Sequence, residues 1–289
     1  YKWRQMRTFG IDEEYITGNA DRYEKWVGFC RVMPYLIGNP IYHWTALELK
    51  RYFDIDEPLS EKNAKEVWDK CNEYLKREDF SAQNLIKKSN VEVICTTDDP
   101  ADDLRYHKQL RGQGFSTKVL PTFRPDKLVN IEKPEFLGYI AANGIDSYEK
   151  AEKWMVERLH YFNDNGCRLS DHGVNEFYAD DFTETEVNTI FRKVMDGKQP
   201  TADEVNKFRS ALMLEGGRMD AKAGWTQQFH YGPMRNNNTR MFRQLGPDTG
   251  YDSIGTWNTS ESLSRFLDRL DCEGNLAKTI LYCINPSEV

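Results

Sequence analysis

The segment QFHYGPMRNNNTRMFRQLGPDTGYDSIG, residues 228–255, is unusually rich in hydrogen-bond donors. It holds one histidine, three arginines, three consecutive asparagines and four glycines, and it follows the short stretch AGWTQ. Guanidinium, imidazole and amide groups at this density suit a site that binds an anionic, oxygen-rich ligand. A solvated loop would also account for them, so the elements around the segment must decide between the two interpretations.

The five histidines do not form a metal-binding motif. No two of them have the spacing H-x-H or H-E-x-x-H, so the sequence shows no complete metal site. His107 and His160 fall in helical patterns and are expected to be core or surface groups, and His43 lies beside aromatic residues and is expected to be structural. His172 and His230 each follow a predicted strand, where a functional and a structural role are equally open.

Arg124 directly follows another predicted strand, and Pro125 stiffens the turn after it. Its planar guanidinium could bind a carboxylate through two hydrogen bonds. The alternative is an ion pair with Asp126 or Asp98. The asparagines at 236–238 tolerate left-handed conformations and can cap the following helix. Capping needs only one of them, which weakly favours a ligand for the others.

After residue 90, short apolar runs alternate with amphipathic helices. The runs are VEVIC (91–95), TKVL (117–120), CRL (167–169), TQQF (226–229) and TILYCI (279–284). This alternation predicts parallel strands with crossover helices, adjacent in chain order in one sheet. Polar residues follow every run, which favours a β/α barrel over a doubly wound sheet with its single switch point. We therefore expect Arg124, His172 and His230 to face one cavity at the strand ends.

Capping signals place the helices between these strands. Thr183 with Glu186, and Thr201 with Glu204, form the pattern of a capping box ahead of an apolar stripe, and Gly197 ends the first of these helices. A third stripe contains Leu263, Phe266, Leu267 and Leu270. Residues 1–90 are predicted to be mostly helical. From the N-cap Ser60, one helical face carries Ala64, Val67, Trp68, Cys71 and Leu75.

Composition excludes several classes of protein. The chain has 289 residues, 39% of them hydrophobic and 29% charged, and a net charge of −7. No apolar stretch approaches the eighteen residues of a membrane span, and the acidic balance argues against a nucleic-acid surface. The six cysteines include no C-x-x-C pair, so we expect reduced core thiols in a cytosolic protein.

The ends of the chain suggest a portion of a longer protein. It begins YKWRQMR, without an initiator methionine or signal peptide, and it stops at CINPSEV, just after a predicted strand. A barrel needs eight strands and about five are visible, so we expect the other three outside residues 1–289.

Several motifs together resemble the uronate isomerase (glucuronate isomerase) family. They are YKWRQMR, IGNPIYHWTALEL, CTTDDPADDL, KVLPTFRPDK, CRLSDHG, the segment 228–255 and KTILYCINP. The resemblance implies a bacterial, cytoplasmic enzyme that interconverts D-glucuronate with D-fructuronate, and D-galacturonate with D-tagaturonate. It also implies a distorted (β/α)8 barrel of the amidohydrolase superfamily. Residues 1–90 would then be a helical insertion after strand one, and 91–289 a partial barrel holding strands two to six.

The resemblance also implies roles for individual residues. Tyr1, Arg124 and His230 match catalytic positions of the family. We expect substrate contacts from Arg235, Asn236 and His172. The family's divalent metal, expected to be zinc, would have no ligand in this chain, because the H-x-H motif would precede Tyr1 and the aspartate would follow Val289. The partner would be a uronate sugar, with homo-oligomer formation left open.

Two other functions remain open from the sequence. A metal-dependent hydrolase of the same superfamily would need further histidines at strand ends five and six, and TILYCINP has none. A truncated, non-catalytic fragment of the isomerase is the second alternative.

Overall fold

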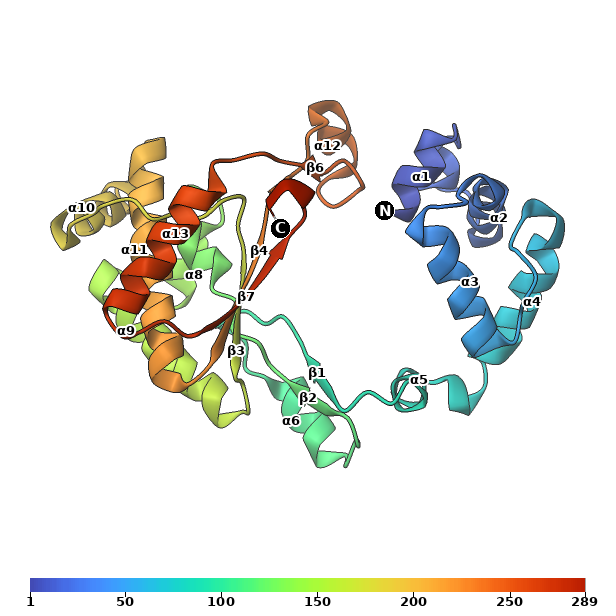
Figure 1. The fold of residues 1–289 in the computed structure, drawn as a ribbon, viewed down its shortest axis with the longest axis horizontal. Coiled ribbons are helices and arrows are strands. Elements are labelled where there is room, and N and C mark those ends of the chain that lie inside the picture. The colour runs from blue at the N-terminus through green and yellow to red at the C-terminus, as the bar shows by residue number, and fades with distance from the viewer. Residues whose placement is uncertain (289) are drawn as a thin grey trace. The chain divides into compact units, whose positions relative to one another are not determined.

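The computed structural model describes residues 1–288, which divide into two compact units (Figure 1). The first unit combines Tyr1–Asn90 with Met234–Ser253, and the second combines Val91–Pro233 with the chain from Ile254 onward. Each unit has its own buried apolar cluster. Segment 234–253, although it follows a strand, therefore belongs with the helical unit. The assignment of residues 1–90 as an insertion into a barrel stays a prediction.

The first unit is helical, as the sequence predicts. Its helices are α1 (Lys2–Thr8), α2 (Arg22–Val32), α3 (Pro40–Phe53), α4 (Ala64–Leu75), α5 (Ala82–Lys88) and α12 (Thr239–Leu245). Short 3-10 turns join several of them, at Glu13–Tyr15, Met33–Tyr35, Glu61–Asn63 and Glu78–Phe80. Ser60 caps the turn at Glu61–Asn63, which leads directly into α4, so the capping signal lies one turn earlier than the helix itself. Ala64 and Val67 of α4 are buried, as the stripe predicts.

The second unit contains the parallel strands. β1 (Val93–Cys95) pairs with β2 (Lys118–Leu120), and β3 (Leu169–Gly173), β4 (Thr226–Tyr231) and β7 (Lys278–Cys283) pair in that order. A small further pair, β5 (Pro233–Met234) with β6 (Ser253–Ile254), was not predicted. The predicted parallel orientation and neighbour order are confirmed.

The expectation of one continuous sheet is wrong. The strands form two ladders, and within residues 1–288 the isolated bridges that connect them run through Phe123. The backbone N–H of Phe123 donates to Leu169 O at 3.0 Å, and the N–H of Asp171 donates to Phe123 O at 2.9 Å. After Leu120 the pairing with β1 becomes irregular, because the N–H of Thr122 donates to the side chain of Asp98 (Oδ2, 3.1 Å). Pro121 faces the other ladder and has no N–H to donate to it.

The ends of β3 and β4 lie further along the chain than the apolar runs suggest. β3 includes His172 and β4 includes His230, so both histidines lie within strands and do not follow them. In β3 the side chains of Ser170, Asp171 and His172 are buried. Ser170 Oγ donates to Asp220 Oδ2 at 2.5 Å, and Asp171 Oδ1 lies 2.7 Å from Nδ1 of His230. Polarity therefore did not mark the end of this strand, because Ser170 and Asp171 find partners within the fold.

Helices cover the β3-β4-β7 ladder on one face. They are α9 (Tyr148–Asp164), α11 (Ala202–Ala223) and α13 (Thr259–Cys272), and α10 (Glu184–Met195) pairs with α11 (Figure 1). The shorter helices α6 (Arg105–Gly112), α7 (Asp126–Val129) and α8 (Phe136–Ala142) follow β1 and β2. Phe229 of β4 meets Phe266 of α13 edge to face, with ring centroids 5.4 Å apart. Phe266 and Leu270 are fully buried, which confirms the predicted stripe. Over residues 1–288, no helix is both long and apolar enough to cross a membrane.

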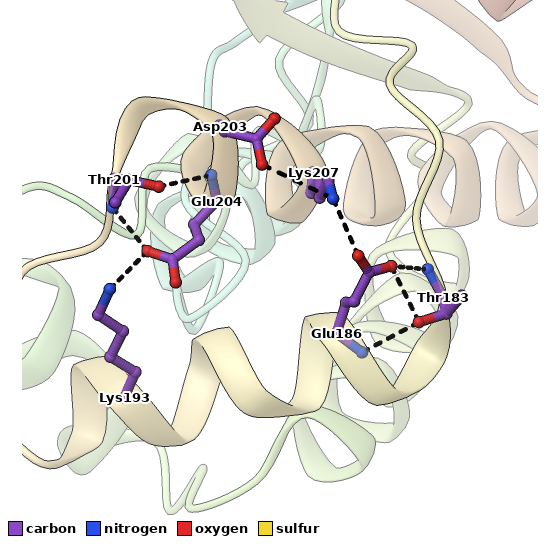
Figure 2. A network of polar contacts seen from close by, with 7 residues as sticks. All are labelled: Thr183, Glu186, Lys193, Thr201, Asp203, Glu204 and Lys207. Carbon is purple, nitrogen blue, oxygen red and sulfur yellow. Dashed lines mark hydrogen bonds and ion pairs between the residues drawn. The ribbon is translucent and has the colours of Figure 1, made fainter.

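Both predicted capping boxes form, and Figure 2 shows them side by side. The carboxylate of Glu186 accepts from the N–H of Thr183 at 2.8 Å, and Glu204 accepts from the N–H of Thr201 at 2.6 Å. Each threonine hydroxyl accepts in return from the N–H of its glutamate, at 3.2 Å. The two helix starts thus satisfy backbone donors that would otherwise lack partners.

Each capping glutamate also binds a lysine of the other helix. Lys207 Nζ lies 2.9 Å from Glu186 Oε1, and Lys193 Nζ lies 2.7 Å from Glu204 Oε2. The hydrogen bond from Lys207, with those from Thr183, lowers the pKa of Glu186 to about 2. One carboxylate therefore serves both as a cap and as an interhelical ion pair.

Asp220 is a buried carboxyl group behind β3. It lies on α11, 2% exposed, and the Ser170 hydroxyl is its side-chain partner. Burial raises its pKa to about 7, and the hydrogen bond from Ser170 offsets only part of this. The folded protein therefore favours the protonated acid at this position.

We predict that removing a cap on α11 weakens the α10–α11 pair. Thr201→Ala should lower the free energy of unfolding by about 1 kcal/mol, the usual value of an N-cap. Thr189→Ala is the matched control, because Thr189 lies inside α10 and its hydroxyl donates to the carbonyl of Thr185 in the same helix. Alanine is the better helix former there, so the control should be neutral or slightly stabilising. Urea unfolding compares the two, and equal losses would contradict the prediction.

We predict that Asp220 makes the protein less stable as the pH rises. Its folded pKa of about 7 lies above the ordinary value of 3.8, so the folded state holds a proton that the unfolded state has released. Stability should fall between about pH 4 and pH 7, by at most about 1.4 kcal/mol per unit, and level off above. Asp220→Asn keeps an acceptor for Ser170 and should remove this component. Between pH 5 and pH 8 the urea midpoint of the wild type should therefore fall relative to that of Asp220→Asn. The same pH dependence of the midpoint in both proteins would contradict the assignment.

Candidate active site

A buried aspartate joins an arginine and a histidine in the second unit. Asp171 Oδ1 lies 2.7 Å from Nδ1 of His230, and Asp171 Oδ2 lies 3.5 Å from Nη1 of Arg124. Asp171 is only 4% exposed, whereas half of the His230 side chain is accessible. A single carboxylate thus holds one cation and one imidazole whose free edge can reach solvent or a ligand.

The strand register produces this arrangement. Across β3 and β4, Asp171 pairs with Gln228 and Gly173 pairs with His230. Residues two apart on a strand share a face, so Asp171 and Gly173 lie on the same side as Gln228 and His230. The opposite side carries Ser170 and the side chains that meet the helices. Sheet pairing therefore brings the carboxylate and the imidazole together without any loop.

Arg124 reaches this face from the segment after β2. Its backbone N–H donates to Asp98 O at 3.0 Å, and its Nε donates to Asp126 Oδ2 at 2.8 Å. The ion pair with Asp126 considered from the sequence therefore exists, and Nη1 of the same guanidinium lies 3.5 Å from Asp171 Oδ2. A Cβ at position 173 would lie 2.2 Å from Nη2 of Arg124. The lack of a side chain at Gly173 is what makes room for the guanidinium.

The hydrogen bond to Asp171 determines which nitrogen of His230 is available. A carboxylate only accepts, so Nδ1 carries the hydrogen, and in the neutral ring Nε2 has a lone pair. An imidazole held in this way can take a proton at Nε2 and return it. Arg124 adds a fixed positive charge beside it. Together they can move a proton next to a developing negative charge.

His172 does not join this group, so the expectation of one cavity shared by Arg124, His172 and His230 is wrong for His172. It is buried, and its ring stacks on Phe229 at 4.9 Å with an interplanar angle of 18°. Burial lowers its pKa. Because side chains alternate along a strand, placing Asp171 on one face turns His172 to the helices.

The other predicted site residues lie in the first unit. Tyr1 is 71% exposed, and its ring meets that of Trp44 edge to face at 6.1 Å. Nη1 of Arg235 pairs with Asp252 Oδ2 at 2.7 Å, and the N–H of Asn236 donates to Asp252 Oδ1 at 2.8 Å. Asp252 thus holds the predicted binding residues Arg235 and Asn236 together.

The three asparagines have separate local roles. Asn236 takes the left-handed conformation with φ of 54°, and Asn238 caps α12 by accepting from the N–H of Met241 at 3.1 Å. Asn237 Nδ2 donates to Met234 O at 3.1 Å. Backbone geometry therefore accounts for their clustering, and a ligand is not needed to explain it.

Asp171 was not among the site residues predicted from the sequence. Asp171 belongs to the motif SDHG, in which the histidine was the predicted site residue. The predicted strand ended at Leu169, before this motif. Extending the strand through Gly173 would have found it, since Asp171 and His172 must then face opposite sides. Within residues 1–288, no three histidine, cysteine or acidic side chains gather in a way that could hold a metal ion.

The chain is similar to known proteins over its whole length. A family model described as glucuronate isomerase matches residues 1–289. The uronate isomerase of Bacteroides thetaiotaomicron is 50% identical over 297 residues, covering 99% of this chain and 63% of that protein. The uronate isomerase of Caldanaerobacter subterraneus is 49% identical over 294 residues, with the same shares covered.

A solved structure gives the same result. The crystal structure of uronate isomerase from Thermotoga maritima superimposes with a TM-score of 0.94 at 32% identity, over 100% of this chain and 64% of that one. The chain spans about 63% of the length of the curated relatives. The resemblance seen in the sequence is thus confirmed from one end of the chain to the other, and the chain belongs to the glucuronate isomerase family.

Proposed function

We propose that the protein carrying this chain is a uronate isomerase that interconverts D-glucuronate with D-fructuronate, and D-galacturonate with D-tagaturonate. Membership of the family supports the reaction, and relatives near 50% identity bear the name uronate isomerase. The single observation that carries the proposal is buried Asp171, bound to both Arg124 and His230. This group supplies what an aldose–ketose isomerisation requires.

The reaction moves a proton between C2 and C1 through a cis-enediol. It needs a group that removes and returns the proton, and a positive charge for the oxyanion that develops. His230 would carry the proton at Nε2, and Asp171 would keep that nitrogen free. Arg124 would bind the anionic oxygens of the substrate or the enediolate. The contacts of His230 and Arg124 with Asp171 support these roles.

The remaining site residues rest on the family resemblance alone. We propose Tyr1 as a further proton-transfer or polarising group, and Arg235 and Asn236 as groups that bind the sugar. His172 is left out of this assignment, because it is buried against Phe229. The metal-dependent hydrolase is the less favoured alternative, because TILYCINP, which carries β7, contains no histidine.

The complete architecture and the metal also belong to this proposal. We infer that the parallel strands are part of a (β/α)8 barrel, supported by their order and by the likeness to the Thermotoga structure. The zinc ion expected from the resemblance does not fit a site made from the described residues alone, since no suitable group of ligands gathers among residues 1–288. A cytoplasmic location and a homo-oligomer remain predictions of the resemblance.

We predict that Arg124 matters far more than Arg235 for turnover. Arg124→Met should lower kcat for conversion of glucuronate to the ketose by about a hundredfold or more, because a charge beside the oxyanion is lost. Arg235→Met should retain kcat and at most raise KM, since the half-exposed Arg235 pairs with Asp252. A ketose assay on the full-length protein measures both. The reverse ranking would overturn the assignment.

We also predict that Gly173→Ala impairs catalysis by displacing Arg124. The added methyl group would meet Nη2 of Arg124 at 2.2 Å and Asp126 Oδ2 at 3.2 Å, so the guanidinium must move. A displacement of about 1 Å can cost up to a hundredfold in kcat. Gly138→Ala in α8 is the control, because a Cβ there has nothing within 4 Å, and it should leave kcat unchanged. Equal activity of the two variants would contradict the role of Gly173.

A further inference from the structure

The aromatic ring of Tyr282 lies flat against the imidazole of His230. The ring centroids are 4.4 Å apart and the interplanar angle is 12°. Tyr282 belongs to β7 and His230 to β4, and the two residues are direct partners in the parallel register. Their side chains therefore share one face of the ladder, and the strand pairing itself produces the contact.

The hydroxyl of Tyr282 is held as well. It donates to Oε1 of Gln228 at 3.0 Å, two residues before His230 on β4. Gln228 lies on the same face and pairs in register with Asp171 on β3. The tyrosine ring is thus anchored at its backbone on one strand and at its hydroxyl on the next. Tyr282 is 43% exposed, and these two anchors hold its ring beside the imidazole.

His230 needs a second constraint of this kind. The rotation of a histidine ring about χ2 is broad, and the side chain is half exposed. The hydrogen bond to Asp171 fixes the position of one ring atom, Nδ1, but leaves the ring able to tilt about that contact. A flat ring stacked on the imidazole removes the tilt. The direction of the Nε2 lone pair is then determined by Asp171 and Tyr282 together.

We propose that Tyr282 is a positioning residue, which acts through His230 by holding the imidazole plane so that Nε2 points at the substrate carbon. The assignment rests on the proposed function of His230. The stacked ring is what orients the imidazole, and the hydrogen bond from the hydroxyl to Gln228 helps to hold that ring in place. Tyr282 itself transfers no proton in this scheme.

The test separates the ring from the hydroxyl in the full-length protein. Tyr282→Ile removes the ring and keeps a strand-forming side chain, and Tyr282→Met is a second ring-free variant. Tyr282→Phe is the matched control that keeps the stack. The ring-free variants should lower kcat for glucuronate by about tenfold to a hundredfold with KM little changed, whereas Tyr282→Phe should keep most of kcat. Urea midpoints confirm that the compared variants are folded.

A double-mutant cycle tests whether the effect passes through His230. His230→Gln should lower kcat strongly, and adding Tyr282→Ile to it should cost nothing more, because there is no imidazole left to orient. Independent losses that multiply would overturn the proposal. So would a ring-free variant with the kcat of the wild type, a Tyr282→Phe variant as slow as Tyr282→Ile, or an effect confined to KM.

An NMR measurement tests the stack of Tyr282 on His230 independently of enzyme activity. In the NMR spectrum of histidine-labelled protein, the ring protons of His230 should be shifted upfield by Tyr282 and should move in Tyr282→Ile but not in Tyr282→Phe. Absence of that shift would overturn the proposal even if no ring-free variant folds. A wild-type protein that shows the shift but forms no ketose from either uronate would instead count against the proposed function.

Discussion

The buried carboxylate of Asp171 is the group on which the candidate site depends. A carboxylate that is almost inaccessible to water is costly unless charged or hydrogen-bonding partners surround it. Asp171 obtains them from Arg124 and His230, on separate parts of the chain. Its backbone N–H also binds Phe123, at the point where the two ladders meet. The same residue therefore connects the two ladders and holds together the side chains of the candidate site.

The β3-β4-β7 ladder works as a two-sided element. Toward the helices it presents His172 and Phe229, which stack, and Ser170, which binds Asp220. Toward the other side it presents Asp171, His230 and Tyr282. Packing on the helical face fixes the register, and the register determines which side chains meet on the opposite face. Stability and chemistry are thus coupled through the strands, although different residues carry them.

Local capping explains why the supporting helices begin where they do. In the α10–α11 pair each capping glutamate is also the partner of a lysine across the interface, so the helix starts and the packing of the pair reinforce each other. α11 in turn carries Asp220, directly behind the strand that bears Asp171. Apolar contacts such as Phe229 with Phe266 bind α13 to the same face.

The sequence by itself determined the features that depend on neighbouring residues. The structure contains the helices predicted from the capping boxes at Thr183 and Thr201 and from the stripe through Phe266 and Leu270. Caps and helical faces can be predicted because they depend on residues only a few positions apart. The parallel order of the strands follows from their alternation with helices. The motifs were also specific enough to identify the family.

Only the tertiary structure decided which side chains meet. Polarity marked an early end for β3, because the sequence cannot show that Ser170 has a partner fifty residues away in Asp220. Because the strand was predicted to end too early, His172 was expected at the site and Asp171 was not. Pairing between distant segments likewise produces three other features. They are the division of the strands into two ladders, the space that Gly173 leaves for Arg124, and the stack of Tyr282 on His230. Side-chain chemistry can be read along the chain, but the face to which each side chain points depends on the register between strands, and that is settled by packing.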